Sequence, residues 1–252
     1  MKLNYIKLGR GRPLLILHGL FGSLDNWKTL GNKFAEEFEV YLIDLRNHGK
    51  SPHSDEFNYQ LIADDLTEFI EDHYLRGIYA IGHSMGGKAL MSLSQHCDLL
   101  DKIVIADIAP KAYSLHHGDL ISIMEKVDLS KIKNRNEIDQ ILQKDIPNLS
   151  IRQFLMKNLY WKAKDQLDWK INLPVIKKNM HLISGEIDDQ KVEIPTLFIR
   201  GELSNYILDD DIPKIQMQFP NSTFETIPKA GHWLHAENPI LFYNLVIAFF
   251  KT

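Results

Sequence analysis

One serine in this 252-residue chain stands in a spacing that can make it a nucleophile. Ser84 lies between Gly82 and Gly86 in the pattern G-x-S-x-G, after the apolar run 78–81 and before a helix-forming run, 88–93. In so sharp a strand-to-helix turn, larger residues two positions to either side would collide. The turn exposes the hydroxyl above the free N–H groups of the new helix. The spacing predicts a nucleophile; a simple glycine-serine turn is the alternative for this stretch alone.

A serine hydroxyl attacks a carbonyl only when a base takes its proton, and histidine suits this task because its pKa lies near neutrality. Among eleven histidines, His232 is the predicted base, because it lies in a Gly-His turn that can reach back over Ser84. His235 is the alternative, although it enters the final predicted helix. His116 and His117 are candidates for substrate contact.

The acid that orients the base is the least determined member of the group. Asp107 directly follows the predicted strand 102–106, so it emerges at the same sheet edge as the serine. Glu202 and the run Asp209–Asp211 follow the next predicted strand and are the alternatives. Because the run stands at the start of a predicted helix, before Ile212-Pro213, helix capping is its simpler interpretation. The sequence favours Asp107.

The carbonyl under attack develops negative charge, which needs fixed hydrogen-bond donors around it. The backbone N–H of Met85, next to the nucleophile, is one expected donor. The other is expected from the His18-Gly19-Leu20 loop, and we assign it to the N–H of Leu20.

Strands and helices alternate over most of the chain, which predicts an α/β fold with a mostly parallel sheet covered by helices on both faces. Ligands of such sheets bind beyond the carboxyl ends of the strands, where the candidate residues converge. The predicted strands are 3–8, 14–17, 40–43, 78–81, 102–106, 196–199 and 223–227, and the predicted helices of this part are 26–38, 59–73, 88–93, 209–219 and 239–249.

The alternation stops between about residues 111 and 190, where several amphipathic helical pieces and an extended, hairpin-like stretch at 161–171 take its place. We interpret 1–110 and 191–252 as the core and 111–190 as a helical lid inserted into it. The predicted helices of the insertion are 118–127, 134–144, 150–159 and 174–183.

Composition excludes several classes of protein. The net charge is −4 and the lysines are scattered, so no basic stripe predicts a nucleic-acid partner. A single cysteine, Cys97, excludes a disulfide framework and indicates a reducing compartment. The N-terminus lacks the apolar run of a signal peptide, and no apolar stretch reaches transmembrane length. We expect a cytoplasmic protein without a membrane span; its oligomeric state is not readable.

The chain resembles the α/β-hydrolase superfamily, and within it small bacterial serine esterases of the YbfF type, which are similar to acyl-CoA thioesterases. The resemblance covers nearly the whole chain. Five ordered motifs carry it: His18 to Ser23, Asp44 to Ser51, Gly82 to Lys88, Asp107 to Pro110, and Gly231 to Glu237.

The order serine, acid, histidine matches this superfamily. In many of its members the acid follows the strand that here ends at Ile199, as G-x-x-D, but this chain has Ser204 at that position. In the YbfF type the acid follows the family's sixth strand, which corresponds to Asp107, and the lid follows the same strand.

The resemblance implies hydrolysis of short- to medium-chain acyl esters, with acyl-CoA thioesters as a further substrate class, and no metal or cofactor. A carbon–carbon bond hydrolase, a perhydrolase and a non-catalytic small-ligand receptor are the alternatives. Several large apolar side chains are candidates for an acyl pocket, with lid packing as their other interpretation. These candidates are Phe21, Phe154, Met156, Tyr160 and Trp161.

Overall fold

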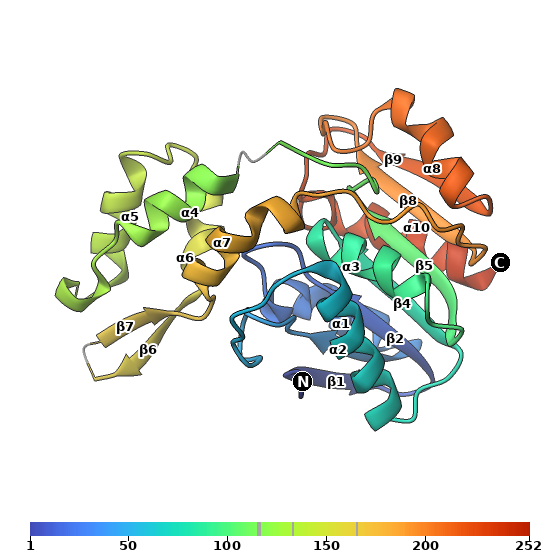
Figure 1. Cartoon of the computed structure of the whole chain (residues 1–252), viewed down its shortest axis with the longest axis horizontal. Coiled ribbons are helices and arrows are strands. Elements are labelled where there is room, and N and C mark those ends of the chain that lie inside the picture. Colours follow the sequence, from blue (N-terminus) through green and yellow to red (C-terminus); the bar gives the residue numbers. More distant parts are fainter. Residues whose placement is uncertain (115–116, 133, 165) are drawn as a thin grey trace.

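The computed structural model describes residues 1–114, 117–132, 134–164 and 166–252. A seven-stranded sheet in the order β1-β3-β2-β4-β5-β8-β9 forms its centre (Figure 1). β1 pairs antiparallel with β3, and all other neighbours pair in parallel. The strands are β1 Tyr5–Gly9, β2 Arg12–Leu17, β3 Phe38–Ile43, β4 Ile78–His83, β5 Leu100–Ala106, β8 Thr196–Gly201 and β9 Ser222–Ile227.

The central strands are continuous apolar runs because both faces of the sheet are covered. β4 is buried along its whole length, and the last four residues of β2, β3 and β5 are buried as well. The helices outside the insertion, two of them single 3-10 turns, are η1 Leu24–Trp27, α1 Lys28–Phe34, α2 Tyr59–Asp72, α3 Met85–Ser94, η3 Asp209–Asp211, α8 Ile212–Gln218, α9 Leu234–Glu237 and α10 Pro239–Lys251.

Two apolar clusters hold these layers together. One lies between the sheet and α2, α3 and α8, and includes Leu66, Leu90 and Phe219. The other lies between the opposite face and α1 and α10, and includes Phe34 and Phe242. The predicted α/β fold is therefore confirmed.

The segment between β5 and β8 folds into helices and one small hairpin, set to one side of the sheet in Figure 1. Strands β6 (Leu159–Ala163) and β7 (Gln166–Trp169) pair antiparallel, as the extended stretch predicted. The other elements of this segment are α4 His117–Glu125, η2 Leu129–Lys131, α5 Arg135–Gln143, α6 Leu149–Met156 and α7 Leu173–Ile183.

Hydrogen bonds attach this segment to the loops that follow β2 and β3. The Asn158 side chain donates to the carbonyl of Phe21 over 2.7 Å. The backbone N–H of Asn172 donates to the carbonyl of Asn47 over 3.0 Å. The insertion is therefore tied to the edge at which the parallel strands end.

Three details differ from the sequence-based picture. The strand before the insertion is β5, the fifth along this chain, because a single antiparallel strand precedes the parallel ones. The predicted helix 26–38 ends earlier in the structure. The turn η1 leads into α1, which ends at Phe34, and β3 already begins at Phe38. The predicted helix 209–219 begins as the 3-10 turn η3. His116 and the side chain of His117 lie outside the described residues.

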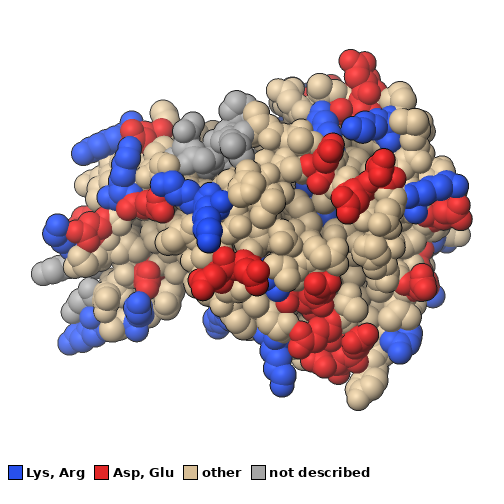
Figure 2. All heavy atoms as spheres, in the orientation of Figure 1, with Lys and Arg blue, Asp and Glu red and all other residues tan. Residues whose placement is uncertain are grey.

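Charged side chains of both signs are interspersed over the face shown in Figure 2. Among the helices of the described ranges, none combines the length and apolar character that crossing a bilayer requires.

Candidate active site

The turn between β4 and α3 holds Ser84 in a backbone conformation that few non-glycine residues adopt, with φ 52° and ψ −118°. A Cβ atom on Gly82 would lie 2.3 Å from the carbonyl oxygen of Gly86, and one on Gly86 would lie 2.6 Å from that of Leu17. The steric reason for G-x-S-x-G is therefore present in the structure. Backbone hydrogen bonds fix the serine, which donates to Ala106 and accepts from Lys88, both over 3.0 Å.

The structure brings Asp107 and His232 together. Oδ2 of Asp107 lies 2.8 Å from Nδ1 of His232, and the carboxylate is fully buried. Its two oxygens accept further hydrogen bonds, from the N–H of Gly201 over 3.1 Å and from the hydroxyl of Ser204. Donors on both oxygens hold the carboxylate in one orientation beside His232.

The alternative acids face elsewhere. Glu202 accepts from the backbone N–H of Lys229 over 2.7 Å, and Asp209 pairs with Arg200 over 2.7 Å. Asp211 pairs with Lys111 and accepts from the N–H of Leu208, as expected of a residue near a helix start. Of the acids that the sequence left open, Asp107 is the one that contacts His232.

Two aromatic neighbours hold the His232 loop in place. The ring of Tyr206 stacks on the imidazole with 3.8 Å between centroids and 16° between planes. Nε2 of His83 donates to the backbone carbonyl of His232 over 2.8 Å. Burial lowers the pKa of His83 well below its ordinary value, so this histidine is neutral at pH 7. Its role in this geometry is to hold the loop.

The loop after β2 is fixed by a second neutral histidine. Nε2 of His18 accepts the N–H of Leu45 over 3.0 Å, so Nδ1 carries the proton and donates to the carbonyl of Gly19 over 2.9 Å. Burial lowers the pKa of His18 to about 4. This arrangement positions Leu20 beside the nucleophile, where both residues line a common cavity.

The two expected oxyanion donors are available. Within the part of the chain that the structure describes, the N–H groups of Leu20 and Met85 donate to no other protein group. Met85 is the first residue of α3, whose N-terminal N–H groups have no partner within the helix. Both donors can therefore serve an incoming oxygen atom.

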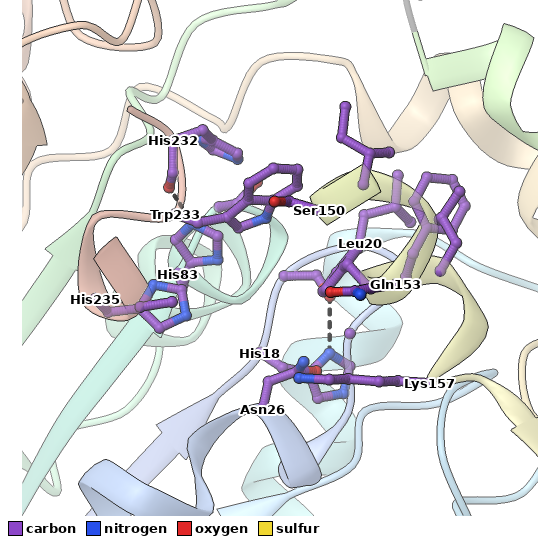
Figure 3. A pocket seen from close by; sticks show the side chains of 18 of the residues that line it. His18, Leu20, Asn26, His83, Ser150, Gln153, Lys157, His232, Trp233 and His235 are labelled. Carbon is purple, nitrogen blue, oxygen red and sulfur yellow. Dashed lines mark hydrogen bonds between the residues drawn. The ribbon is translucent and has the colours of Figure 1, made fainter. Parts of the chain in front are cut away.

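A cavity of about 510 Å³ lies at this edge of the sheet, and Figure 3 shows it from close by. Ser84 and His232 lie in its wall, together with the predicted pocket residues Phe21 and Phe154. Its other apolar walls come from the loop after β2, from the insertion and from the turn that carries His232. They include Leu20, Trp27, Leu120, Ile151, Leu155 and Trp233.

Three predicted pocket residues are placed elsewhere, so their assignment is wrong. Met156 does not line the cavity; it is partly buried and packs against the apolar cluster that includes Leu66 and Leu90. Tyr160 and Trp161 belong to β6, where they are 37% and 50% exposed. A two-stranded hairpin has too little covering structure to bury both faces, so these side chains meet solvent.

Sequence reasoning missed several residues of the site. Tyr206 follows two positions after Ser204, and both contact the Asp107–His232 pair. The only available signal was that Ser204 replaces the expected acid. The polar residues Asn26, Ser150, Gln153 and Lys157 also line the cavity, and nothing in their local sequence marks them.

This arrangement supports nucleophilic acyl transfer: a serine at the apex of its turn in the cavity wall, a histidine oriented by a buried carboxylate, and two free N–H donors. The described residues include no group of three or more His, Cys, Asp or Glu side chains arranged to hold a metal ion.

The comparisons agree with this geometry. A family model described as "alpha/beta hydrolase fold" matches residues 12–239. A putative esterase/lipase of Haemophilus influenzae is 38% identical, over 94% of this chain and 84% of that protein. Esterase YbfF of Escherichia coli is 34% identical, over 90% and 88%. A solved structure titled "Marine microorganism esterase" superimposes with a TM-score of 0.96 at 44% identity, over 98% and 99%. The chain belongs to the family of α/β-hydrolase fold proteins.

Proposed function

We propose that this chain is a serine hydrolase that cleaves carboxylic esters through an acyl-enzyme on Ser84. The observation that carries the proposal is the 2.8 Å contact between the buried Asp107 and His232, which lines the same cavity as Ser84. Similarity to proteins named as esterases supports the same class of substrate.

In the proposed mechanism, Oγ of Ser84 attacks the ester carbonyl while Nε2 of His232 takes the hydroxyl proton. Asp107 accepts the Nδ1–H bond, so it fixes the ring tautomer and stabilises the imidazolium that forms. The N–H groups of Leu20 and Met85 bind the developing oxyanion; removing one such donor typically costs about 3–4 kcal/mol of barrier.

The tetrahedral intermediate then collapses. The bond from the carbonyl carbon to the alcohol oxygen breaks, and His232 returns its proton to the leaving alcohol. Water attacks the acyl-enzyme with His232 again acting as base, so the carboxylic acid leaves and Ser84 regains its proton. Each proton accepted by His232 is given back, so the cycle needs no external acid or base.

The same proposal assigns roles to the two parts of the chain. Residues 1–110 and 191–252 form the hydrolase core, and 111–190 form a lid over it. Phe154 and Leu120, which belong to the insertion, line the cavity beside core residues, so the lid contributes to the binding of the acyl group. A cavity of about 510 Å³ suits short- to medium-chain acyl esters, and a thioester presents the same carbonyl to Ser84.

Hydrolysis of p-nitrophenyl esters from acetyl to palmitoyl tests the proposal, with Ser84→Ala as the matched variant. We expect the wild type to hydrolyse the shorter esters. The Ser84→Ala variant should have a kcat lower by about 10⁶-fold, the loss found when the nucleophile of a serine protease is removed. Labelling with a fluorophosphonate followed by mass spectrometry should place the adduct on Ser84.

Turnover that persists in a folded Ser84→Ala variant would contradict the mechanism. A folded wild-type protein that hydrolyses none of the esters would favour the carbon–carbon bond hydrolase, perhydrolase or receptor alternatives instead.

A further inference from the structure

One end of the cavity is polar in a way that ester hydrolysis does not need. Asn26, Gln153 and Lys157 line it, and Figure 3 shows the Lys157 side chain extending toward Asn26, next to His18. Within the described ranges, Lys157 is the single lysine or arginine among the lining residues.

The amide of Asn26 is held in one orientation. Its Oδ1 accepts the backbone N–H of Ser23 over 2.8 Å, so the amide oxygen is occupied and the NH₂ group remains as a donor. Among the described residues, neither Nδ2 of Asn26 nor Nζ of Lys157 has a hydrogen-bond or ion-pair partner. The polar end therefore offers two donors that no described group occupies, beside the Gln153 amide, which can donate or accept.

The other ionisable groups of the cavity wall do not provide an anion that pairs with Lys157. Burial lowers the pKa of His18 to about 4 and that of His235 to about 3, so both rings are neutral at pH 7. Among the lining residues that the structure describes, the one carboxylate is that of Glu237, which accepts the N–H of Gly231 over 2.7 Å in the turn that carries His232.

We propose that Asn26 and Lys157 bind an anionic group, a carboxylate or a phosphate, carried by the ester substrate. The inference rests on the proposed ester hydrolysis and adds a substrate class to it: esters with one anionic end and an apolar part between that end and the carbonyl. An amide N–H donor and an ammonium together match the oxygens of such a group. The anion can belong to the acyl part or to the alcohol part, and the experiment separates these sources.

Position at a helix end is the competing explanation for Lys157, because a lysine beside the last carbonyls of α6 interacts favourably with the helix dipole. The chain offers a matched control for this effect. Lys144 follows α5 in the same way, is exposed, and is not among the residues that line the cavity. Lys144→Met removes the same charge from the same part of the chain.

The test compares kcat/KM for matched pairs of esters, in which one member carries a carboxylate or a phosphate and the other is neutral. The acyl arm pairs p-nitrophenyl hemiglutarate with p-nitrophenyl valerate, and the alcohol arm pairs 1-butyrylglycerol 3-phosphate with 1-butyrylglycerol. The measured quantity is kcat/KM for the anionic ester divided by kcat/KM for the neutral ester. A general loss of activity lowers both values and cancels in this ratio.

In at least one arm, Lys157→Met should lower this ratio by up to about fivefold, the upper end for an exposed ion pair, whereas Lys144→Met should leave it unchanged. Asn26→Asp keeps the acceptor for Ser23 but replaces the donor with a negative charge, so it should lower the ratio further. Added salt should reduce the wild-type ratio, because it screens the attraction.

An effect confined to one arm identifies whether the anion lies on the acyl or the alcohol side. The inference would be overturned if the wild type, Lys157→Met and Asn26→Asp all gave the same ratio of kcat/KM values in both arms. If the neutral esters were still hydrolysed in a Ser84-dependent way, the proposed function would stand. Absence of Ser84-dependent turnover on all four esters would overturn both.

Discussion

The edge of the sheet and the inserted segment are held in place by different forces. At the edge, the backbone of each reactive residue is bonded to the neighbouring strand: Ser84 donates to Ala106 over 3.0 Å and Asp107 donates to Ile199 over 2.8 Å. These residues are buried, and their positions follow from the register of the ladder.

In the parts of the insertion that the structure describes, no strand pairs with the central sheet. Its helices are amphipathic, with Ile138 and Leu142 of α5 buried inside the segment while most of that helix faces solvent. The difference teaches that the strand ends fix the chemistry of this site, whereas side-chain packing fixes the shape of its pocket.

Lys88 joins the two regions. It lies in α3 behind the nucleophile and is almost fully buried, and its ammonium donates to the carbonyls of Lys111 and Gly185 at the two ends of the insertion. The ring of Tyr113 lies 4.9 Å from the same nitrogen. One cation therefore binds both connections between core and insertion.

The largest expected effect breaks the sheet-edge arrangement. Asp107→Asn should lower kcat for p-nitrophenyl butyrate by about 10⁴-fold, because the amide cannot hold the His232 tautomer that accepts the serine proton. Steady-state kinetics measure the loss, and a thermal melt shows whether the variant is folded. Near-wild-type activity in a folded variant would move the role of the acid to another carboxylate.

A smaller effect is expected from the hydroxyl that supports Asp107. Ser204→Ala removes a hydrogen bond to a charged group, worth about 1.5–3 kcal/mol, so kcat should fall at least about tenfold. Ser204→Thr retains the hydroxyl and is the matched control. If the alanine and threonine variants were equally active, the hydroxyl would have no part in holding the carboxylate.

The contribution of Lys88, which joins the two regions, to the free energy of unfolding should depend on pH. Burial lowers the pKa of Lys88 to about 7, whereas an unfolded lysine titrates near about 10.4. Between these values the unfolded chain binds more protons at Lys88, so the contribution of this residue to stability rises with pH; below pH 7 both states are protonated and the full cost of the buried charge remains.

Urea unfolding of the wild type and of Lys88→Met, from about pH 6 to pH 9, measures this contribution. The difference in unfolding free energy should favour the wild type increasingly above about pH 7, by at most about 1.4 kcal/mol per pH unit. A difference independent of pH would mean that the two carbonyls keep the ammonium charged throughout.

The smallest effects compare two aromatic residues of the insertion. Phe154→Ala removes apolar area from the cavity wall, so kcat/KM for longer acyl chains should fall by about three- to tenfold. Trp161→Ala, on the exposed hairpin, should leave kcat/KM within about twofold. A larger loss from Trp161→Ala would show that the hairpin reaches the substrate.

The sequence by itself determined the α/β fold and the strand-to-helix turn around Ser84. Both follow from local physics: continuous apolar runs suit strands covered on both faces, and only glycine fits where a Cβ would meet a carbonyl oxygen at 2.3 Å. The acid remained open, because three carboxylate positions follow suitable strands and the choice depends on which carboxylate contacts His232.

Only the tertiary structure decided which residues line the pocket and which residues hold the Asp107–His232 pair in place. Phe154 lines the cavity while Met156, two positions along the same helix, packs away from it, and no pattern separates two large apolar residues so close together. Ser204 meets Asp107 across 97 residues of chain, a contact created by the pairing of β5 with β8. Side chains that act through distant partners are fixed by packing, so local sequence carries little trace of them.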